Sequence, residues 1–262
     1  GLVASAVIGF TGMFGTTHEF LLKSWMQNYL FALSISLGAF FFVFIQHLTR
    51  AGWSSTIRRV AELIAANLQW AWVGLVPLVI LWFSGGGHAG EGHAEGHGAW
   101  GPAVLFPWAD LELMKSHNYD EYKLVSGKTA YLNAPFFWIR AVIYVAFWAF
   151  ASRWYLTRSL RQDDTGEVSI TSTMQKWSGP MAIGFGLTTS FAAFDWIMSL
   201  SPAWFSTMFG VYFFAGCCTS GFAMMIVAVV QVQSFGRLKE VVNREHYQDL
   251  GKLLFGFGMV FW

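Results

Sequence analysis

The segment TTSFAAFDWIMSLSPAWF, residues 188–205, carries one ionisable side chain, Asp195, among phenylalanine, tryptophan and alanine residues. A carboxylate within a membrane-spanning helix costs about 3 kcal/mol or more unless a partner or a polar cavity compensates it. Such groups pair with an opposite charge, and many of them serve ion or proton transfer. Asp195 is therefore the residue for which the sequence most directly indicates chemistry.

A second segment, LNAPFFWIRAVIYVAFW at residues 132–148, carries the opposite charge, Arg140. If the two helices run in opposite directions, Arg140 follows the start of its helix by about as many residues as Asp195 precedes the end of its own. At 1.5 Å per residue, both charges then lie roughly 7–9 Å from the same end of the bundle. The depths predict that Arg140 pairs with Asp195.

Asp195 also belongs to a stripe of small and polar residues, because helix positions three or four apart share a face. The stripe consists of Gly184, Thr188, Ala192, Asp195 and Ser199. Small residues let a neighbouring helix approach closely, so we expect Asp195 to point into the bundle. Two interpretations stay open: an ion pair that only locks two helices together, and a proton-accepting or quinol-binding group.

Other polar residues could line a path through the bundle. Tyr144 follows Arg140 by one turn, and His47 lies at the inner end of another apolar segment. His18 and Glu19 are expected in the first outer loop, where a histidine that titrates near neutrality suits proton exit. The same two residues would also be ordinary in a solvated loop.

The elements that must position these residues are membrane helices. The chain is 55% hydrophobic and 12% charged, with a mean hydropathy of +0.46, which is typical of an integral membrane protein. Apolar runs near the ~20 residues needed to span a bilayer predict an all-α, polytopic bundle in one domain, residues 1–262. The expected helices are 1–13, 29–48, 57–83, 134–155, 179–200, 205–232 and 250–262, of which the first and last look cut, so we expect a longer protein.

Charges between these segments predict their orientation. Most of the 16 Lys and Arg residues fall in alternate connections, which the positive-inside rule places in the cytoplasm. They are Arg50, Arg58, Arg59, Arg153, Arg158, Arg161, Lys176, Arg237, Lys239, Arg244 and Lys252. Within the first part of the 57–83 segment, Val60, Leu63, Ile64 and Leu68 have helical spacing.

The connection at residues 84–133 is then a large periplasmic loop. It begins with a Gly- and His-rich insertion, residues 85–98, in which His88, His93 and His97 could bind a metal. Glycine-rich backbone does not hold ligands in place, so a flexible segment is the other interpretation. The aromatic residues in the remainder favour a folded cap on the membrane surface.

The sequence predicts no cofactor bound covalently to this chain. Cys217 and Cys218 are adjacent, and the sequence has neither C-x-x-C-H nor a cysteine cluster for iron–sulfur. Any redox centres would therefore belong to other chains. A net charge of +1 argues against a nucleic-acid partner.

Three segments carry a resemblance to a known family: FDWIMSLSPAWFSTMFGVYFFAG at 194–216, LNAPFFWIRAVIYVAFW at 132–148 and NYLFALSISLGAFFFVFIQHLTRAGWSSTIRR at 28–59. Together they resemble the ActF membrane subunit of bacterial alternative complex III, a quinol:electron acceptor oxidoreductase. The resemblance covers nearly all of the chain, and 194–216 is its most specific part.

The resemblance implies paired four-helix bundles of the polysulfide reductase membrane-subunit type, in a bacterial cytoplasmic membrane. It also implies ubiquinol or menaquinol as electron donor and cytochrome c or a terminal oxidase as acceptor. The implied partners are a multihaem cytochrome c, an iron–sulfur protein, a paralogous quinol-binding membrane subunit and lipids, with haem c and iron–sulfur clusters on those subunits.

Three functions remain open from the sequence. The first is a scaffold and proton-conducting subunit of that respiratory complex. The second is a subunit with its own quinone site, in which Asp195 and an outer-loop histidine accept protons. The third is a secondary transporter, a class that tends to have internal repeats and broken helices near the midplane.

Overall fold

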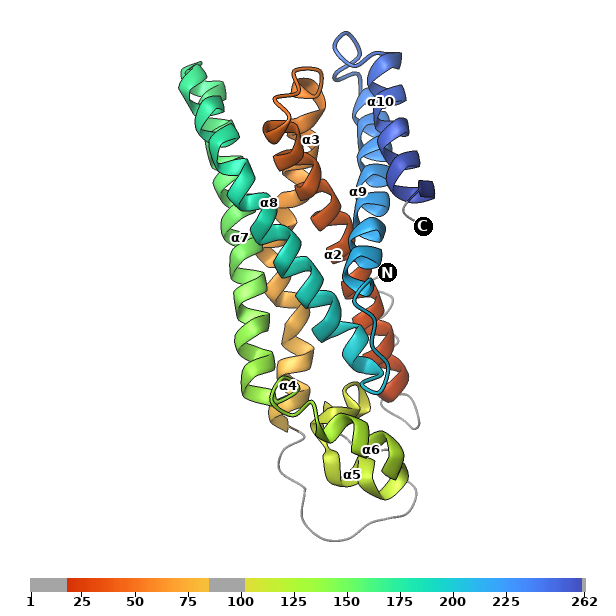
Figure 1. The fold of residues 1–262 in the computed structure, drawn as a ribbon. Helices are drawn as coiled ribbons and strands as arrows, with labels where there is room; N and C mark the ends of the chain where they lie inside the picture. The colour runs from red at the N-terminus through yellow and green to blue at the C-terminus, as the bar shows by residue number, and fades with distance from the viewer. Residues whose placement is uncertain (1–17, 85–101, 261–262) are drawn as a thin grey trace. The chain divides into compact units, whose positions relative to one another are not determined.

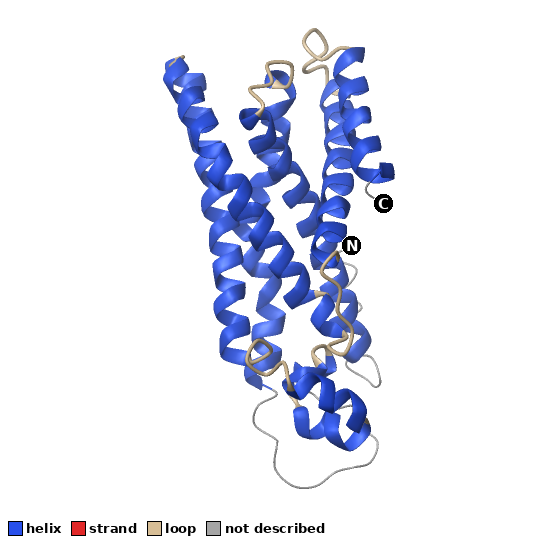
Figure 2. Cartoon of the chain, in the orientation of Figure 1, coloured by secondary structure: helices blue, strands red, loops and turns tan. Residues whose placement is uncertain are grey.

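The computed structural model describes residues 18–84 and 102–260, and every regular element in those ranges is a helix (Figures 1 and 2). The all-α prediction is confirmed for this part of the chain. The elements are α2 (His18–Leu48), α3 (Ser55–Ala65), the 3-10 helix η1 (Ala66–Leu75), α4 (Val76–Ser84), η3 (Pro102–Val104), η4 (Pro107–Ala109), α5 (Leu111–His117), α6 (Tyr119–Ser126), α7 (Ala134–Thr165), α8 (Val168–Trp196), η5 (Met198–Leu200), α9 (Phe209–Ser234), α10 (Arg244–Phe255) and the π-helix η6 (Gly256–Val260).

Five helical stretches in the described ranges are long and apolar enough to cross a membrane. They are Phe20–Leu48, Ser55–Phe83, Ala134–Thr165, Val168–Leu200 and Phe209–Ser234. This is the architecture of a multi-pass membrane protein. The segment expected at 1–13 lies outside the described residues.

Several helices are longer than their apolar parts. α2 begins at His18 rather than 29, α7 continues to Thr165 rather than 155, and α8 begins at Val168 rather than 179. Hydropathy marks only the length of a helix that lies within the bilayer, whereas the helical hydrogen bonds of the backbone can continue into polar sequence beyond it. His18 and Glu19 therefore belong to a helix, which corrects the expected loop.

The basic residues expected in cytoplasmic loops also lie largely on helices for this reason. Arg58 and Arg59 are in α3, and Arg153, Arg158 and Arg161 are in α7. The helix expected at 250–262 begins earlier, at Arg244. Asn243 starts this helix through a reciprocal cap with His246, which explains why its polar first turns are helical.

The segment predicted as one helix over 57–83 changes from α-helix to 3-10 helix and back. It is α-helical to Ala65, a 3-10 helix over 66–75 and α-helical again from Val76. Pro77 has no N–H, so the carbonyls of the preceding turn lose a donor. The indole Nε1 of Trp25 supplies one instead, donating to the Gly74 carbonyl at 3.1 Å.

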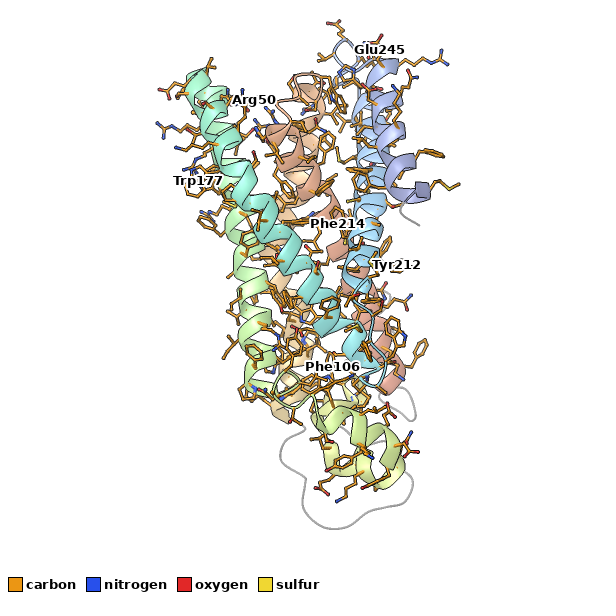
Figure 3. The ribbon with its side chains drawn as sticks, viewed as in Figure 1. Arg50, Phe106, Trp177, Tyr212, Phe214 and Glu245 are labelled. Carbon is orange, nitrogen blue, oxygen red and sulfur yellow. The ribbon has the colours of Figure 1, made fainter. Side chains whose placement is uncertain are left out.

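The described part of the 84–133 connection, residues 102–133, folds into short helices. The Asp110 side chain accepts from the Leu113 N–H at 3.0 Å and so caps α5, and Asn118 caps α6 through the Glu121 N–H at 3.3 Å. Phe106, labelled in Figure 3, is buried, and its ring centre lies 5.2 Å from that of Phe137. The insertion 85–98, with His88, His93 and His97, lies outside the described residues.

The chain forms two compact units, each with its own core. Unit 1 comprises Gly1–Phe31, Trp72–Val142 and Phe194–Thr207, and unit 2 comprises Ala32–Ala71, Ile143–Ala193 and Met208–Trp262. The described part of unit 1 has a core of tryptophan and phenylalanine rings, including Trp82, Phe106, Trp108 and Phe137.

Unit 2 has a phenylalanine core between α2, α8 and α9. Phe41 lies 4.9 Å from Phe214, ring centre to ring centre, and Phe44 lies 5.0 Å from Phe185 (Phe214 is labelled in Figure 3). Helices α2 and α9 touch through backbone. A Cβ on Gly38 would lie 1.9 Å from the Cys217 carbonyl oxygen, so only glycine fits there.

Candidate functional site

The candidate site is a buried ion pair in unit 1. Arg140 Nε donates to Asp195 Oδ2 at 2.7 Å and Arg140 Nη2 donates to Asp195 Oδ1 at 2.8 Å. Asp195 is fully buried, at 0% exposure, and Arg140 is 7% exposed. The predicted pairing is confirmed, in the two-point geometry that a planar guanidinium and a carboxylate share.

Arg140 has further partners beside the carboxylate. Its Nη1 donates to the Tyr131 carbonyl at 3.1 Å, and its Cζ lies 3.9 Å from the centre of the Tyr131 ring. The Phe136 ring contributes a second aromatic face, 4.1 Å from Cζ. Aromatic faces attract a cation when water is excluded, so these contacts stabilise the guanidinium inside an apolar segment.

Asp195 is positioned by the end of α8. The helix ends at Trp196, and residues 198–200 form a 3-10 turn. That turn stops before Ser201, because the residue before a proline disfavours helical backbone. Ser199 is therefore off the α8 stripe on which it was predicted. Its hydroxyl donates to the Asp195 backbone carbonyl instead.

The position of Asp195 at the C-terminal end of α8 increases its need for a positively charged partner. A negative charge near a helix C-terminus is disfavoured by the exposed carbonyl dipoles, and Asp195 occupies the last turn of α8. Burial and helix dipole thus both oppose its charge. Arg140 is the contact that offsets both.

Tyr131 places a hydroxyl group at the same site. The hydroxyl is buried beside the Asp195 carboxylate. Burial, and after it the nearby Asp195 carboxylate, raise the pKa of Tyr131 above its usual value. The phenol therefore stays protonated beside the carboxylate.

A pocket of about 300 Å³ adjoins the ion pair within unit 1. Tyr131 and Ser199 line it, and both also contact the pair. The rest of its lining is mostly apolar: Gly127, Lys128, Ala130, Leu132, Phe194, Met198, Pro202, Trp204 and Phe205. A small ring could enter this space and reach the Tyr131 side of the pair.

Lys128 closes one side of that pocket. Its Nζ donates to the Pro202 carbonyl at 2.7 Å and lies 5.3 Å from the centre of the Phe205 ring. The ion pair and this contact both connect the segment around 128–140 to the segment around 195–205. Lys128 therefore helps to fix the pocket wall.

The other predicted residues lie in unit 2 or lack described side chains. Thr188 accepts from the Trp148 indole at 3.0 Å and donates to the Gly184 carbonyl at 2.7 Å. The Tyr144 ring lies 6.2 Å from that of Trp148, and His47 is buried against Tyr155. Thr188 thus makes polar contacts in unit 2, whereas Tyr144 and His47 pack against aromatic rings there. The role of all three in proton transfer stays a prediction.

Sequence reasoning missed Tyr131 and Lys128 as site residues. Both lie in the connection before α7, and nothing in their spacing shows that they return to Asp195. The one available signal was the aromatic and basic character of that connection. In the part of the chain that the structure describes, no group of three His, Cys, Asp or Glu side chains could hold a metal.

No protein-family model and no curated protein matches this chain. The site combines a fully buried carboxylate, a guanidinium with three further contacts, and a pocket beside them. Such a site can hold a charge pair in lipid, and it can accept a proton next to a bound ring.

Proposed function

We propose that this chain is an integral membrane subunit of a respiratory quinol:electron acceptor oxidoreductase of the alternative complex III type, in the bacterial cytoplasmic membrane. Its role there is to hold the assembly together and to relay protons. The observation that supports this most is the Arg140–Asp195 pair. It joins residues 132–148 to residues 194–216, two of the segments that carry the family resemblance.

The surroundings of the pair suit a proton relay. When Asp195 accepts a proton, Arg140 loses the negative charge beside it. The Tyr131 carbonyl and the rings of Tyr131 and Phe136 still contact the guanidinium, so its charge keeps favourable partners. Protonating Asp195 still removes the charge pairing, and these contacts offset part of that cost while they keep the guanidinium in place.

Proton release accompanies quinol oxidation, and electrons leave separately through redox centres. In this proposal haem c and iron–sulfur clusters belong to partner subunits, among them a multihaem cytochrome c and an iron–sulfur protein. A paralogous membrane subunit supplies the main quinol site. The present chain contributes membrane helices and an acid–base group.

A second function is favoured by the pocket beside Tyr131: a quinol site on this chain. About 300 Å³ is at the lower end for small-molecule sites and would admit a quinone ring. Ala130→Phe would fill the pocket, whereas Thr129→Phe changes an exposed neighbour that does not line it. Quinone extracted from the purified chain should fall with the first variant and persist with the second. Equal quinone content in both would exclude this pocket.

The main proposal is tested on the intact assembly from native membranes. An affinity-tagged chain should purify with quinol-dependent cytochrome c reduction, and Asp195→Asn should lower turnover and proton release at unchanged haem content. Unchanged turnover and proton release in Asp195→Asn would exclude the relay role. Absence of quinol oxidation from the purified wild-type material would exclude the complex.

A further inference from the structure

His47, near the C-terminal end of α2 in unit 2, is buried with unsatisfied hydrogen-bonding groups. The residue is 1% exposed, and its ring stacks on Tyr155 at 5.4 Å between centres. Within the described ranges neither ring nitrogen has a hydrogen-bond partner, and the amide oxygen of the neighbouring Gln46 also lacks one. Buried polar atoms without protein partners commonly bind ordered water.

Glu62 on α3 is a second buried polar group in unit 2. It is 2% exposed, and its Oε2 accepts from Arg59 Nη1 at 2.9 Å. Arg58 Nε lies 3.6 Å from Oε1, outside hydrogen-bonding distance. Oε1 accepts no hydrogen bond from the described residues, so this carboxylate has room for a further donor.

The two groups face adjacent turns of α7. His47 stacks on Tyr155, and the Ser159 side chain, one turn further along α7, lies at the Glu62 carboxyl group. Arg58 approaches both, because it lies beside Glu62 and within electrostatic range of His47. His47 on α2 and Glu62 on α3 therefore both meet α7, one turn apart, with Arg58 near each of them.

The region around Glu62 connects to solvent through Arg59. The same guanidinium that binds Glu62 also bonds to Asp163 on α7, whose side chain is 62% exposed. Arg59 therefore lies between a buried and an exposed carboxylate. If Glu62 is protonated, Asp163 still balances the charge of Arg59, so neutralising Glu62 does not leave that arginine without an anion.

We propose that Glu62 and His47 bound a hydrated proton-uptake site that opens to solvent beside Asp163. Hydronium in the solvent gives one proton through water to Oε1 of Glu62, which accepts no hydrogen bond from the described residues, and water is left behind. The Glu62 carboxylic acid then passes that proton to the water held at the His47 ring, which restores the carboxylate. The ionisable groups facing Glu62 are Arg58 and Arg59 from α3 and Asp163 from α7.

This site goes beyond the proposed membership of a respiratory complex, because it needs only residues of this chain. Its test is independent of quinol oxidation and haem content. It can therefore fail while the proposed function holds, and the reverse.

The test is infrared difference spectroscopy of the full chain in lipid, recorded between acidic and alkaline buffer in water and in deuterium oxide. We expect a carboxylic-acid band that shifts in deuterium oxide within minutes and is lost in Glu62→Gln. Glu245→Gln, at an exposed acid labelled in Figure 3, should leave the band in place. Carbon-13 glutamate labelling of the wild type assigns the band to glutamate should Glu62→Gln fail to fold.

Histidine nitrogen-15 spectra supply the second readout. A ring resonance in exchange with water should be present in the wild type and missing in His47→Phe. A glutamate band that does not shift in deuterium oxide would show a dry ion pair and overturn the proposal. So would the absence of any glutamate band, or a His47 resonance without water contact.

Discussion

Arg140 and Asp195 are 55 positions apart in the sequence, and two different nitrogens of the Arg140 guanidinium donate to the two oxygens of the Asp195 carboxylate. The two residues come from the beginning of α7 and the end of α8. Both are buried, so the free energy of the pair depends on keeping both hydrogen bonds and both charges. The first prediction follows from this dependence.

Replacing Asp195 by asparagine should destabilise unit 1 strongly. The change leaves the buried guanidinium without an anion, which typically costs about 3–5 kcal/mol. Arg140→Lys should cost roughly 1–3 kcal/mol, because an ammonium group cannot reproduce the two-point contact. Thermal unfolding in detergent, followed by tryptophan fluorescence, measures both.

The double variant Arg140→Gln with Asp195→Asn separates pairing from packing. It removes both charges, so it should be more stable than the sum of the separate Arg140→Gln and Asp195→Asn changes predicts. Strictly additive effects would show that the two side chains contribute independently, contrary to the structure.

Tyr131 should make the folded state less stable as the pH rises into the alkaline range. Its pKa is raised in the folded protein, mainly by burial and then by Asp195. Unfolded tyrosine ionises near pH ~10, so the folded state binds a proton more tightly than the unfolded state. This contribution is complete below that pH and is lost as the pH rises towards the folded pKa.

Tyr131→Phe should therefore flatten the loss of stability above pH ~10. Tyrosinate absorbance should show one group fewer among those that ionise last. If the variant removes a group that ionises with the earliest tyrosines, the Tyr131 hydroxyl is not buried beside the carboxylate.

Gly38 should tolerate no side chain. A Cβ there would lie 1.9 Å from the Cys217 carbonyl oxygen and 2.9 Å from the Gly221 Cα, and backbone cannot move aside as a flexible side chain can. Gly38→Ala is expected to cost about 1–3 kcal/mol through overpacking. Gly216→Ala on α9, where nothing lies within 4 Å, is the matched control. Equal unfolding temperatures for the two variants would contradict this α2–α9 contact.

Lys128 should restrain the segment after α8. Its bond to the Pro202 carbonyl is charge-assisted, and losing it costs roughly 1.5–3 kcal/mol. Lys128→Met should therefore speed amide exchange over residues 201–207 by about tenfold or more. Lys123→Met, at an exposed lysine of α6, should leave that exchange unchanged. The same slow exchange in both variants would argue against the Lys128 contact.

The sequence predicted the helical class and the Arg140–Asp195 partnership, because isolated charges in apolar segments are few and must find each other. Depth along two antiparallel helices then left one suitable partner. Tyr131 could not be found in this way. It lies outside the apolar segments, and its approach to Asp195 depends on how the 127–133 connection folds back.

Glu62 was missed for a different reason. Helical spacing places Val60, Leu63, Ile64 and Leu68 on one apolar face. In a soluble protein that face would be buried. In the structure Leu63 is 57% exposed whereas Glu62 is 2% exposed. In a membrane helix an apolar side chain can face lipid, so hydrophobicity does not decide which face is buried. Pro77 is the local signal for the 3-10 stretch over 66–75, but the bond from Trp25 to the Gly74 carbonyl comes from a distant residue that the sequence does not place there.

The most direct test of the proposed function is the visible spectrum and haem stain of what copurifies with this chain from its native membrane in mild detergent. The proposed function predicts haem c absorption bands and large extrinsic subunits that migrate with the chain through size-exclusion chromatography. A colourless single polypeptide that retains its fold would contradict it, and transport of a solute by the chain alone would then be the activity to measure.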